Sequence, residues 1–522
     1  ANIGFAGNVY VGQQAGYWHD AGYSVFVGSG AGKNYMSGSS VVAIGHYAMR
    51  GYATSSAVGT YNVVIGPHAG YNWKSSFHSL VMGYKAGYEG AGSRDNTLLG
   101  AFAGQNMSGS QQYNTYVGSA AGYGKSLGSG ITAIGKSALG NTDWKGLSNV
   151  NGDYIGLTAV GYFAGQNVVQ SFSTFVGYEA GRYSAGSSNN FFGYLAGRGS
   201  QTSEPYGNGS NNVGIGREAL NQVQSGSNNI AIGRDTFKYL RHESNSVAVG
   251  MYAGRYATGS QNTFVGSEAG KGGTTSAPYS SGQYNTAVGY RALEEFTTGG
   301  YNSILGQEAG EKITTGESNT LLGYRAGRNV TSGNSNIVIG VEAQRDENVS
   351  SVVAIGARAG LFNSGNDNVY LGDTAGRNSG AGTDQVIIGH DAGYYATHDG
   401  VVLIGESAGY YATGSNNVFI GKEAGKGGTT SAPYSSGEKN VAVGTNALTA
   451  FTTGTTNVAI SQDALAANQA TNNMIAIGFQ AMFSSNHADT VGNVAIGYTA
   501  LRNNVKGAGN VAIGDEAGRN AT

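Results

Sequence analysis

Residues 510–518 read Asn-Val-Ala-Ile-Gly-Asp-Glu-Ala-Gly, and close variants of this stretch fill the chain. Two other copies are residues 262–270 (NTFVGSEAG) and 417–425 (NVFIGKEAG). We number each copy from the glycine that follows the apolar residues, which is position 0. About 29 copies follow one another, mostly in steps of 16 or 17 residues. Such a short period over the whole chain indicates a solenoid, in which each repeat packs on its neighbours.

Each copy carries the pattern of a short β-strand before its glycine. Position −1 is a large apolar residue in every copy, and position −3 is mostly Val, Ile or Thr. β-Branched residues favour strands, and residues two apart lie on the same side of a strand. We therefore expect positions −3 and −1 to fill the inside of the coil. Alanine at position +3 predicts a second, tighter inward site, and glycine at position 0 predicts a turn or a close approach of chains.

Asparagine and a second glycine mark the rest of the repeat. A glycine recurs at position −7, as at Gly299 and Gly316, and predicts a second turn. Each coil would then hold two short strands and two turns. Asparagines stacked on successive coils can form amide ladders along the axis. Position −4 is asparagine in about 18 copies, among them Asn62, Asn96, Asn229, Asn302, Asn440 and Asn510.

These patterns predict an all-β fold, a single parallel β-roll or β-solenoid of about 29 coils with 16–17-residue repeats. Because the sequence shows no linker and no break in composition, we predict one continuous domain over residues 1–522. Residues 1–11 would form an irregular or partial first coil. Ninety glycines held in register argue against disorder.

Position −2 would face outward in this arrangement, although it is apolar or glycine throughout. A soluble monomer does not leave so long a hydrophobic column in water. We therefore predict that the column is buried against other copies of the chain, the alternative being a flattened roll with weak alternation. This candidate self-association stripe comprises Tyr10, Phe26, Val64, Leu98, Phe175, Phe264, Leu321, Phe419, Ala442, Ala459, Ala476, Ala495 and Ala512.

Several coils carry a longer far turn, and three of these turns share a Pro-Tyr pair. Residues 270–282 recur without change as residues 425–437, which indicates internal duplication of a block of coils. Insertions at one edge of a solenoid are often its interaction surface, and neutral drift at a tolerant turn is the alternative. The candidate interaction loops contain Pro205, Tyr206, Pro278, Tyr279, Pro433 and Tyr434.

The composition and the polar residues give no sign of catalysis. A net charge of −2 creates no field for nucleic acid, and no apolar run predicts a membrane-spanning helix. The chain has no cysteine, and its histidines are scattered, with His390 and His398 lacking a third ligand. Acids at +2 and bases at +5 recur with the coil, as surface ion pairs do. Stacked tyrosines at +1 and +5 suit a structural role or sugar binding. We expect no catalytic residue, no metal site and no cofactor.

The run Asn-Val-Ala-Ile-Gly, at Asn493 and Asn510, resembles the head repeats of trimeric autotransporter adhesins. Residues 285–290 are similar to repeats in some phage tail fibres and large surface proteins. The resemblance implies a left-handed parallel β-roll that associates as a trimer. The step of 16–17 residues is longer than in that family, and no coiled-coil segment is present, so the resemblance does not imply the family's usual anchoring.

These observations predict a non-enzymatic structural protein located outside the cell, on the cell surface or in a virion fibre. It would be a β-solenoid subunit of a self-assembling fibre or filament, and its partners would be other copies, joined laterally, as a trimer, or end to end through the unfinished coil at residues 3–7. The alternative is a trimeric adhesin or phage receptor-binding tail-fibre head, whose long turns recognise a glycan or another cell-surface target. Ice binding is disfavoured because no regular Thr-x-Thr column exists.

Overall fold

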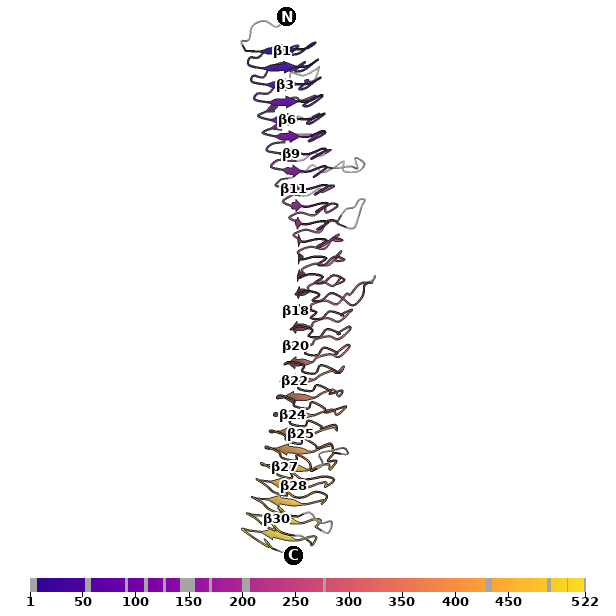
Figure 1. The fold of residues 1–522 in the computed structure, drawn as a ribbon, viewed down its shortest axis with the longest axis vertical. Helices are drawn as coiled ribbons and strands as arrows, with labels where there is room; N and C mark the ends of the chain where they lie inside the picture. The colour runs from indigo at the N-terminus through magenta and orange to yellow at the C-terminus, as the bar shows by residue number, and fades with distance from the viewer. Residues whose placement is uncertain are drawn as a thin grey trace. The chain divides into compact units, whose positions relative to one another are not determined.

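The computed structural model is an all-β parallel solenoid with a repeat of about 17 residues, as the sequence predicts (Figure 1). The chain divides into two units, Ala1–Gln261 and Asn262–Thr522, and each is described by itself. The prediction of one continuous domain stays a prediction. The structure describes residues 7–51, 58–89, 93–107, 111–124, 128–140, 155–168, 171–199, 207–275, 278–428, 434–485, 490–504 and 506–520.

In the first unit, each coil gives one three-residue strand to a parallel sheet, and each strand pairs in register with the next, as Val9 does with Val25. Residues 9–11, which lie in the expected irregular or partial first coil, form the first strand. The strands are β1 (Val9–Val11), β2 (Val25–Val27), β3 (Val42–Ile44), β4 (Val63–Ile65), β6 (Leu80–Met82), β8 (Thr97–Leu99), β9 (Thr115–Val117), β10 (Thr132–Ile134), β11 (Thr158–Val160), β12 (Thr174–Val176), β13 (Asn190–Phe192), β14 (Val213–Ile215), β15 (Ile230–Ile232) and β16 (Val247–Val249).

The second unit repeats this arrangement, and its strands also pair in parallel and in register, as Thr263 does with Thr286. Its strands are β17 (Thr263–Val265), β18 (Thr286–Val288), β19 (Ser303–Leu305), β20 (Thr320–Leu322), β21 (Ile337–Ile339), β22 (Val353–Ile355), β23 (Val369–Leu371), β24 (Val386–Ile388), β25 (Val402–Ile404), β26 (Val418–Ile420), β27 (Val441–Val443), β28 (Val458–Ile460), β29 (Ile475–Ile477), β30 (Val494–Ile496) and β31 (Val511–Ile513).

The opposite side of the coil has little strand structure. Within the described residues, β5 (Ser76–Phe77) and β7 (Ser93–Arg94) form one two-stranded sheet, and isolated parallel bridges such as Ser37 with Val58 lie elsewhere. The expectation of two strands in every coil is therefore wrong for most described coils, since in the described residues a second strand is present only in the coils that hold β5 and β7. Turns and bends make up most of this side elsewhere in the described residues.

The glycine at position 0 is required by the stacking of coils. Gly372 has a φ of 136°, and a Cβ on this residue would lie 2.7 Å from the carbonyl oxygen of Gly389 in the next coil. Most position-0 glycines meet the backbone of the next one in the same way, so these positions admit a side chain only at a cost in strain. Ser461 is the exception and keeps a φ of 104°.

The predicted asparagine ladder is confirmed. Asn319 is fully buried, and its Nδ2 donates to Oδ1 of Asn302 over 3.0 Å and to the carbonyl oxygen of Gly333 over 2.9 Å. Its own Oδ1 accepts from the backbone N–H and the Nδ2 of Asn336, over 3.0 and 2.9 Å. One side chain thus bonds the coil before it and the coil after it, and it satisfies the backbone at the second turn.

The side chains inside the coil are those at position −2. The prediction that positions −3 and −1 face inward is therefore wrong. Phe26, Val64, Leu98, Phe175, Phe264, Leu321, Phe419, Ala442, Ala459, Ala476 and Ala495 are at most 1% exposed. Tyr10 and Ala512, in the first and last described coils, are half-buried. The proposed self-association stripe is therefore the hydrophobic core. Both parities of the strand are apolar, so apolarity alone did not distinguish the inside from the outside.

The core is completed by position +4, whose volume complements that of position −2. The ring of Phe419 lies where a Cβ of Gly425 would stand, and the ring of Tyr370 relates to Gly376 in the same way. In most coils with a small residue at −2, position +4 is large and buried, as Leu448 is in the coil of Ala442, whereas the coils of Ala159, Ala248 and Ala354 have glycine at +4. Close packing of a narrow interior explains this exchange of volume.

Candidate functional site

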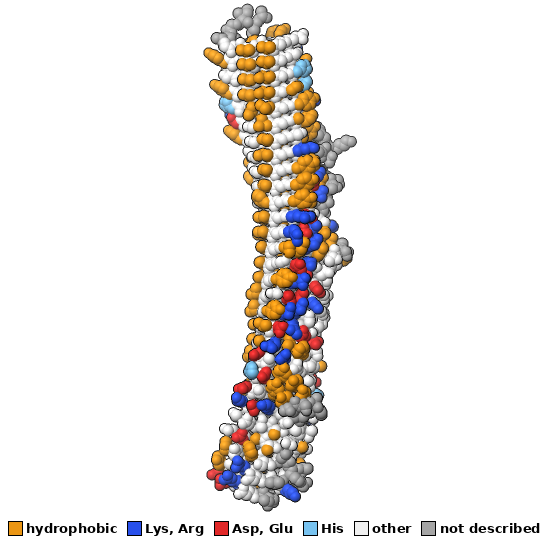
Figure 2. Space-filling view, viewed as in Figure 1, with side chains coloured by type: hydrophobic (Ala, Val, Ile, Leu, Met, Phe, Trp, Pro, Cys, Tyr) orange, Lys and Arg blue, Asp and Glu red, His pale blue; other side chains and the backbone are white. Residues whose placement is uncertain are grey.

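Positions −3 and −1 form the outer face of the sheet, and this face is exposed and apolar. Leu371 and Ile420, for example, are 43% and 36% exposed. Figure 2 shows apolar side chains gathered in columns over the upper and middle parts of the visible face. The large apolar residues of the outer face that are exposed are Val9, Val11, Ile44, Leu80, Met82, Ile134, Phe192, Ile215, Ile230, Ile232, Leu305, Leu322, Ile337, Leu371, Ile420, Ile460, Ile475, Val511 and Ile513.

The outer face is divided into blocks by its −3 column. Threonines occupy this column from β8 to β12. Each pairs in register with the threonine of the next strand, from Thr97 to Thr174. Threonine and serine return from β17 to β20. From β21 to β31 both columns hold only Val, Ile or Leu, over eleven consecutive strands. The last block is the longest aliphatic surface in the second unit.

The candidate loops are described only in part. Pro205, Tyr206 and Pro433 lie outside the described residues, whereas Pro278 is exposed and Tyr279 half-buried. The ring of Tyr434 stacks on Tyr395, with centroids 4.5 Å apart, and lies 5.8 Å from Tyr411. This loop tyrosine therefore packs on the body of its own unit.

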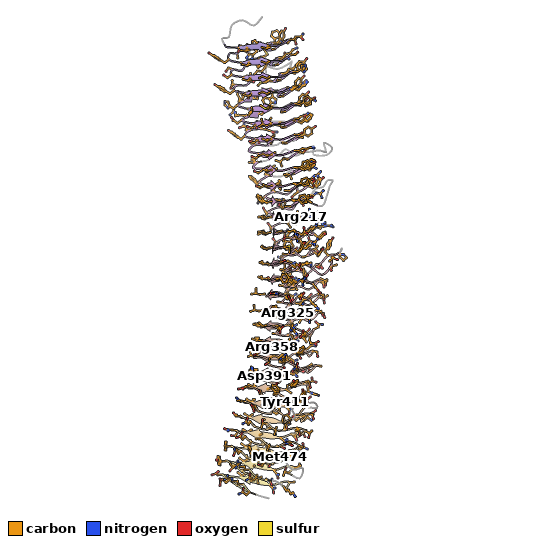
Figure 3. All side chains as sticks on the ribbon, in the orientation of Figure 1. Arg217, Arg325, Arg358, Asp391, Tyr411 and Met474 are labelled. Carbon is orange, nitrogen blue, oxygen red and sulfur yellow. The ribbon has the colours of Figure 1, made fainter. Side chains whose placement is uncertain are left out.

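Many surface tyrosines stack along the axis, and charged side chains cover the ends of the stacks. Tyr162, Tyr178 and Tyr194 lie on successive coils with centroids 5.1 and 5.3 Å apart. Lys136 lies 5.7 Å from the ring of Tyr162, and Arg217, labelled in Figure 3, lies 5.9 Å from that of Tyr194. The ring faces in this stack contact either another tyrosine or a charged side chain, so they are not free to stack on a sugar. The geometry therefore favours the structural role.

The recurring charges bridge adjacent coils. Position +2 alternates between acid and base over six coils, through Glu268, Arg291, Glu308, Arg325, Glu342 and Arg358. Arg291 Nε lies 3.2 Å from Glu268 Oε2, and Arg325 Nε lies 2.7 Å from Glu308 Oε2. This hydrogen bond from Arg325 holds the pKa of the Glu308 carboxyl below its usual value. Arg325 and Arg358 are labelled in Figure 3. The alternation places an opposite charge on both sides of the four inner residues of this column, which opposes slippage between these coils.

Reversal of one charge in this column is expected to destabilise the protein. Arg325→Glu removes a charge-assisted hydrogen bond and places three acids in succession, at an expected cost of about 2 kcal/mol. In the parent, the ionised Glu308 stabilises the fold at neutral pH, and this stabilisation is lost as the pH falls through its lowered pKa. The difference in free energy of unfolding between variant and parent therefore becomes smaller in acid. Denaturant unfolding at pH 7 and in acid measures both effects.

Lys422→Glu is the control for that variant, since it reverses the charge of a pair with Glu406 in which both side chains are 54% exposed. Such a pair contributes about 0–1 kcal/mol. Equal losses in the two variants would contradict a special role for the alternating column.

The described residues contain no group of three His, Asp or Glu side chains arranged to hold a metal ion. His390 contacts Asp391, with Nδ1 and Oδ2 3.5 Å apart, and His398 contacts Thr397. In the part of the chain that the structure describes, no helix is long and apolar enough to cross a membrane. Comparison with known protein families and with curated proteins finds no match for the chain.

Proposed function

We propose that this protein is a structural subunit of an extracellular fibre, assembled by lateral contact between the outer faces of several copies. The observation that carries the proposal is the apolar outer face, above all its aliphatic block from β21 to β31. The resemblance of the repeats to those of trimeric surface adhesins and tail fibres supports the extracellular setting.

The size of the aliphatic block suits contact with a second copy. Eleven strands about 4.8 Å apart extend over roughly 50 Å, and two columns with their side chains are about 10 Å wide. The block therefore presents on the order of 500 Å² per copy, and two copies would bury about 1,000 Å². This reaches the lower bound for a specific interface before the aliphatic strands of the first unit are counted.

Charges introduced into the aliphatic block are expected to abolish assembly. The variant Leu371→Lys, Ile420→Lys and Ile460→Lys places three ammonium groups where a neighbouring sheet would lie, and an unpaired buried charge is costly. We expect the parent to show a multiple of the monomer mass by light scattering and fibres by electron microscopy. The variant should have the monomer mass and an unchanged circular dichroism spectrum.

The matched control carries three lysines on exposed apolar residues outside the outer face. Val341, Met251 and Tyr498 all stand at position +1 and are 51%, 40% and 54% exposed. Their replacement by lysine should leave the assembled mass unchanged. A parent of monomer mass at all concentrations, or equal loss of assembly in both variants, would contradict the proposal.

A further inference from the structure

Tyr284 and Tyr301 form an exposed pair at the edge of the sheet in the second unit. They stand at the same repeat position on adjacent coils, with ring centroids 4.8 Å apart and planes 11° from parallel. The two side chains are 45% and 60% exposed. Each has a φ of about 60° and is separated by one buried asparagine from the strand that follows it. The backbone therefore holds the two phenols side by side while solvent reaches both.

We propose that Tyr284 and Tyr301 are a site of oxidative cross-linking, at which a one-electron oxidant of the peroxidase class joins the two rings as dityrosine. Each phenol loses one electron and one proton. The two phenoxyl radicals combine through the ring carbons beside the hydroxyl groups, and the two hydrogens on those carbons move to the oxygens. One hydrogen peroxide accepts the electrons and protons and leaves as two waters. The inference does not rest on the proposed assembly, because both rings belong to one chain.

The geometry favours this pair over the other tyrosine stacks. Tyr178 and Tyr194 are exposed to a similar degree, but their centroids lie 5.3 Å apart and Arg217 covers one end of the stack. Tyr395 and Tyr434 are closer, at 4.5 Å, but both are half-buried. The chain has no cysteine, so a disulfide cannot join its coils, and a bond between Tyr284 and Tyr301 would join two coils covalently.

Peptide mapping of the full chain, oxidised with a haem peroxidase and hydrogen peroxide at low protein concentration, tests the proposal. Trypsin separates the two rings, because Tyr301 is the single tyrosine of residues 292–312 and Tyr284 lies in residues 272–291. We expect these two peptides to appear joined, two hydrogen atoms lighter than their sum and with dityrosine fluorescence. This should be the most abundant tyrosine cross-link, and its formation should raise the melting temperature.

Tyrosine-to-phenylalanine variants show which two residues form the cross-link. Tyr284→Phe and Tyr301→Phe keep a ring in the stack but remove the phenol, so each should abolish the joined peptide. Tyr290→Phe removes a phenol from the same tryptic peptide and should leave the cross-link in place. Persistence of the joined peptide in Tyr284→Phe, absence of any joined peptide in the parent, or a larger yield of a link between Tyr178 and Tyr194 would overturn the proposal.

Discussion

Phe419→Ala is expected to cost about 3–5 kcal/mol of stability, because it removes a fully buried ring from the narrow interior of the coil. Phe419 contacts the ring of Phe451 from the next coil, with centroids 5.4 Å apart, and fills the space beside Gly425. Neither neighbour can close the cavity, since both are held by the stacked backbone. Denaturant unfolding, together with hydrogen exchange of the amides in β26 and β27, measures the loss and locates it.

Ile420→Ala is the matched control, because Ile420 is the next residue of the same strand and points to the outer face. It is 36% exposed, so its truncation in an unassembled chain should cost about 1 kcal/mol. Comparison of the two variants decides which side of the strand is inside. A larger loss in Ile420→Ala than in Phe419→Ala would restore the parity that the sequence analysis predicted.

A second substitution in the same coil should rescue Phe419→Ala. Gly425→Leu supplies a large residue at position +4, and it creates the pair that Ala442 and Leu448 form in the next coil. Leucine can adopt the backbone conformation of Gly425, because Leu448 has the same φ of 52°. We expect the double variant to recover at least half of the lost stability. Gly425→Leu alone should be destabilising, because its side chain would overlap the ring of Phe419.

The fold class was predictable from the sequence because a solenoid expresses its geometry in every repeat. The glycine at position 0 was expected at a turn or a close approach of chains and the asparagine at −4 in a ladder along the axis, and the structure gives both residues these roles. The period also placed almost every strand, since each strand directly precedes its glycine. The first strand, at residues 9–11, falls in the segment expected to be an irregular or partial first coil, although Tyr10 was placed at position −2 of the repeat.

The direction of the side chains was not predictable from apolarity, since Val418, Phe419 and Ile420 are all apolar. A different signal was present in the sequence. In most coils a large residue at position −2 goes with glycine at +4 and a small residue at −2 goes with a large one at +4, whereas positions −3 and −1 keep similar sizes. Residues that share a closed space must compensate one another, and residues on an open face need not. This compensation indicates that position −2 lies inside the coil. The candidate self-association surface is then formed by positions −3 and −1.

Asn319→Asp is expected to cost about 3 kcal/mol or more at pH 7, although the two side chains have nearly the same shape. The carboxylate loses the two hydrogen bonds that Nδ2 donates, and it meets the oxygens of Asn302 and Gly333 as an unpaired buried charge. Burial raises the pKa of such a carboxyl above its unfolded value, so the destabilisation grows as the pH rises through the unfolded pKa of about 4 and shrinks below it. Unfolding of variant and parent at pH 7 and pH 4 gives this difference.

Asn334→Asp is the control, because it tests whether an Asn-to-Asp change outside the buried ladder also destabilises the protein. Asn334 is exposed, and its Oδ1 accepts from the backbone N–H of Glu317 over 2.7 Å, a bond that a carboxylate also accepts. Its replacement should therefore change the stability by less than about 0.5 kcal/mol, with no recovery in acid. The acid recovery of Asn319→Asp is the decisive feature, because a simple packing defect would destabilise equally at both pH values. An equal loss at pH 7 and pH 4 would show that the ladder acts through shape alone.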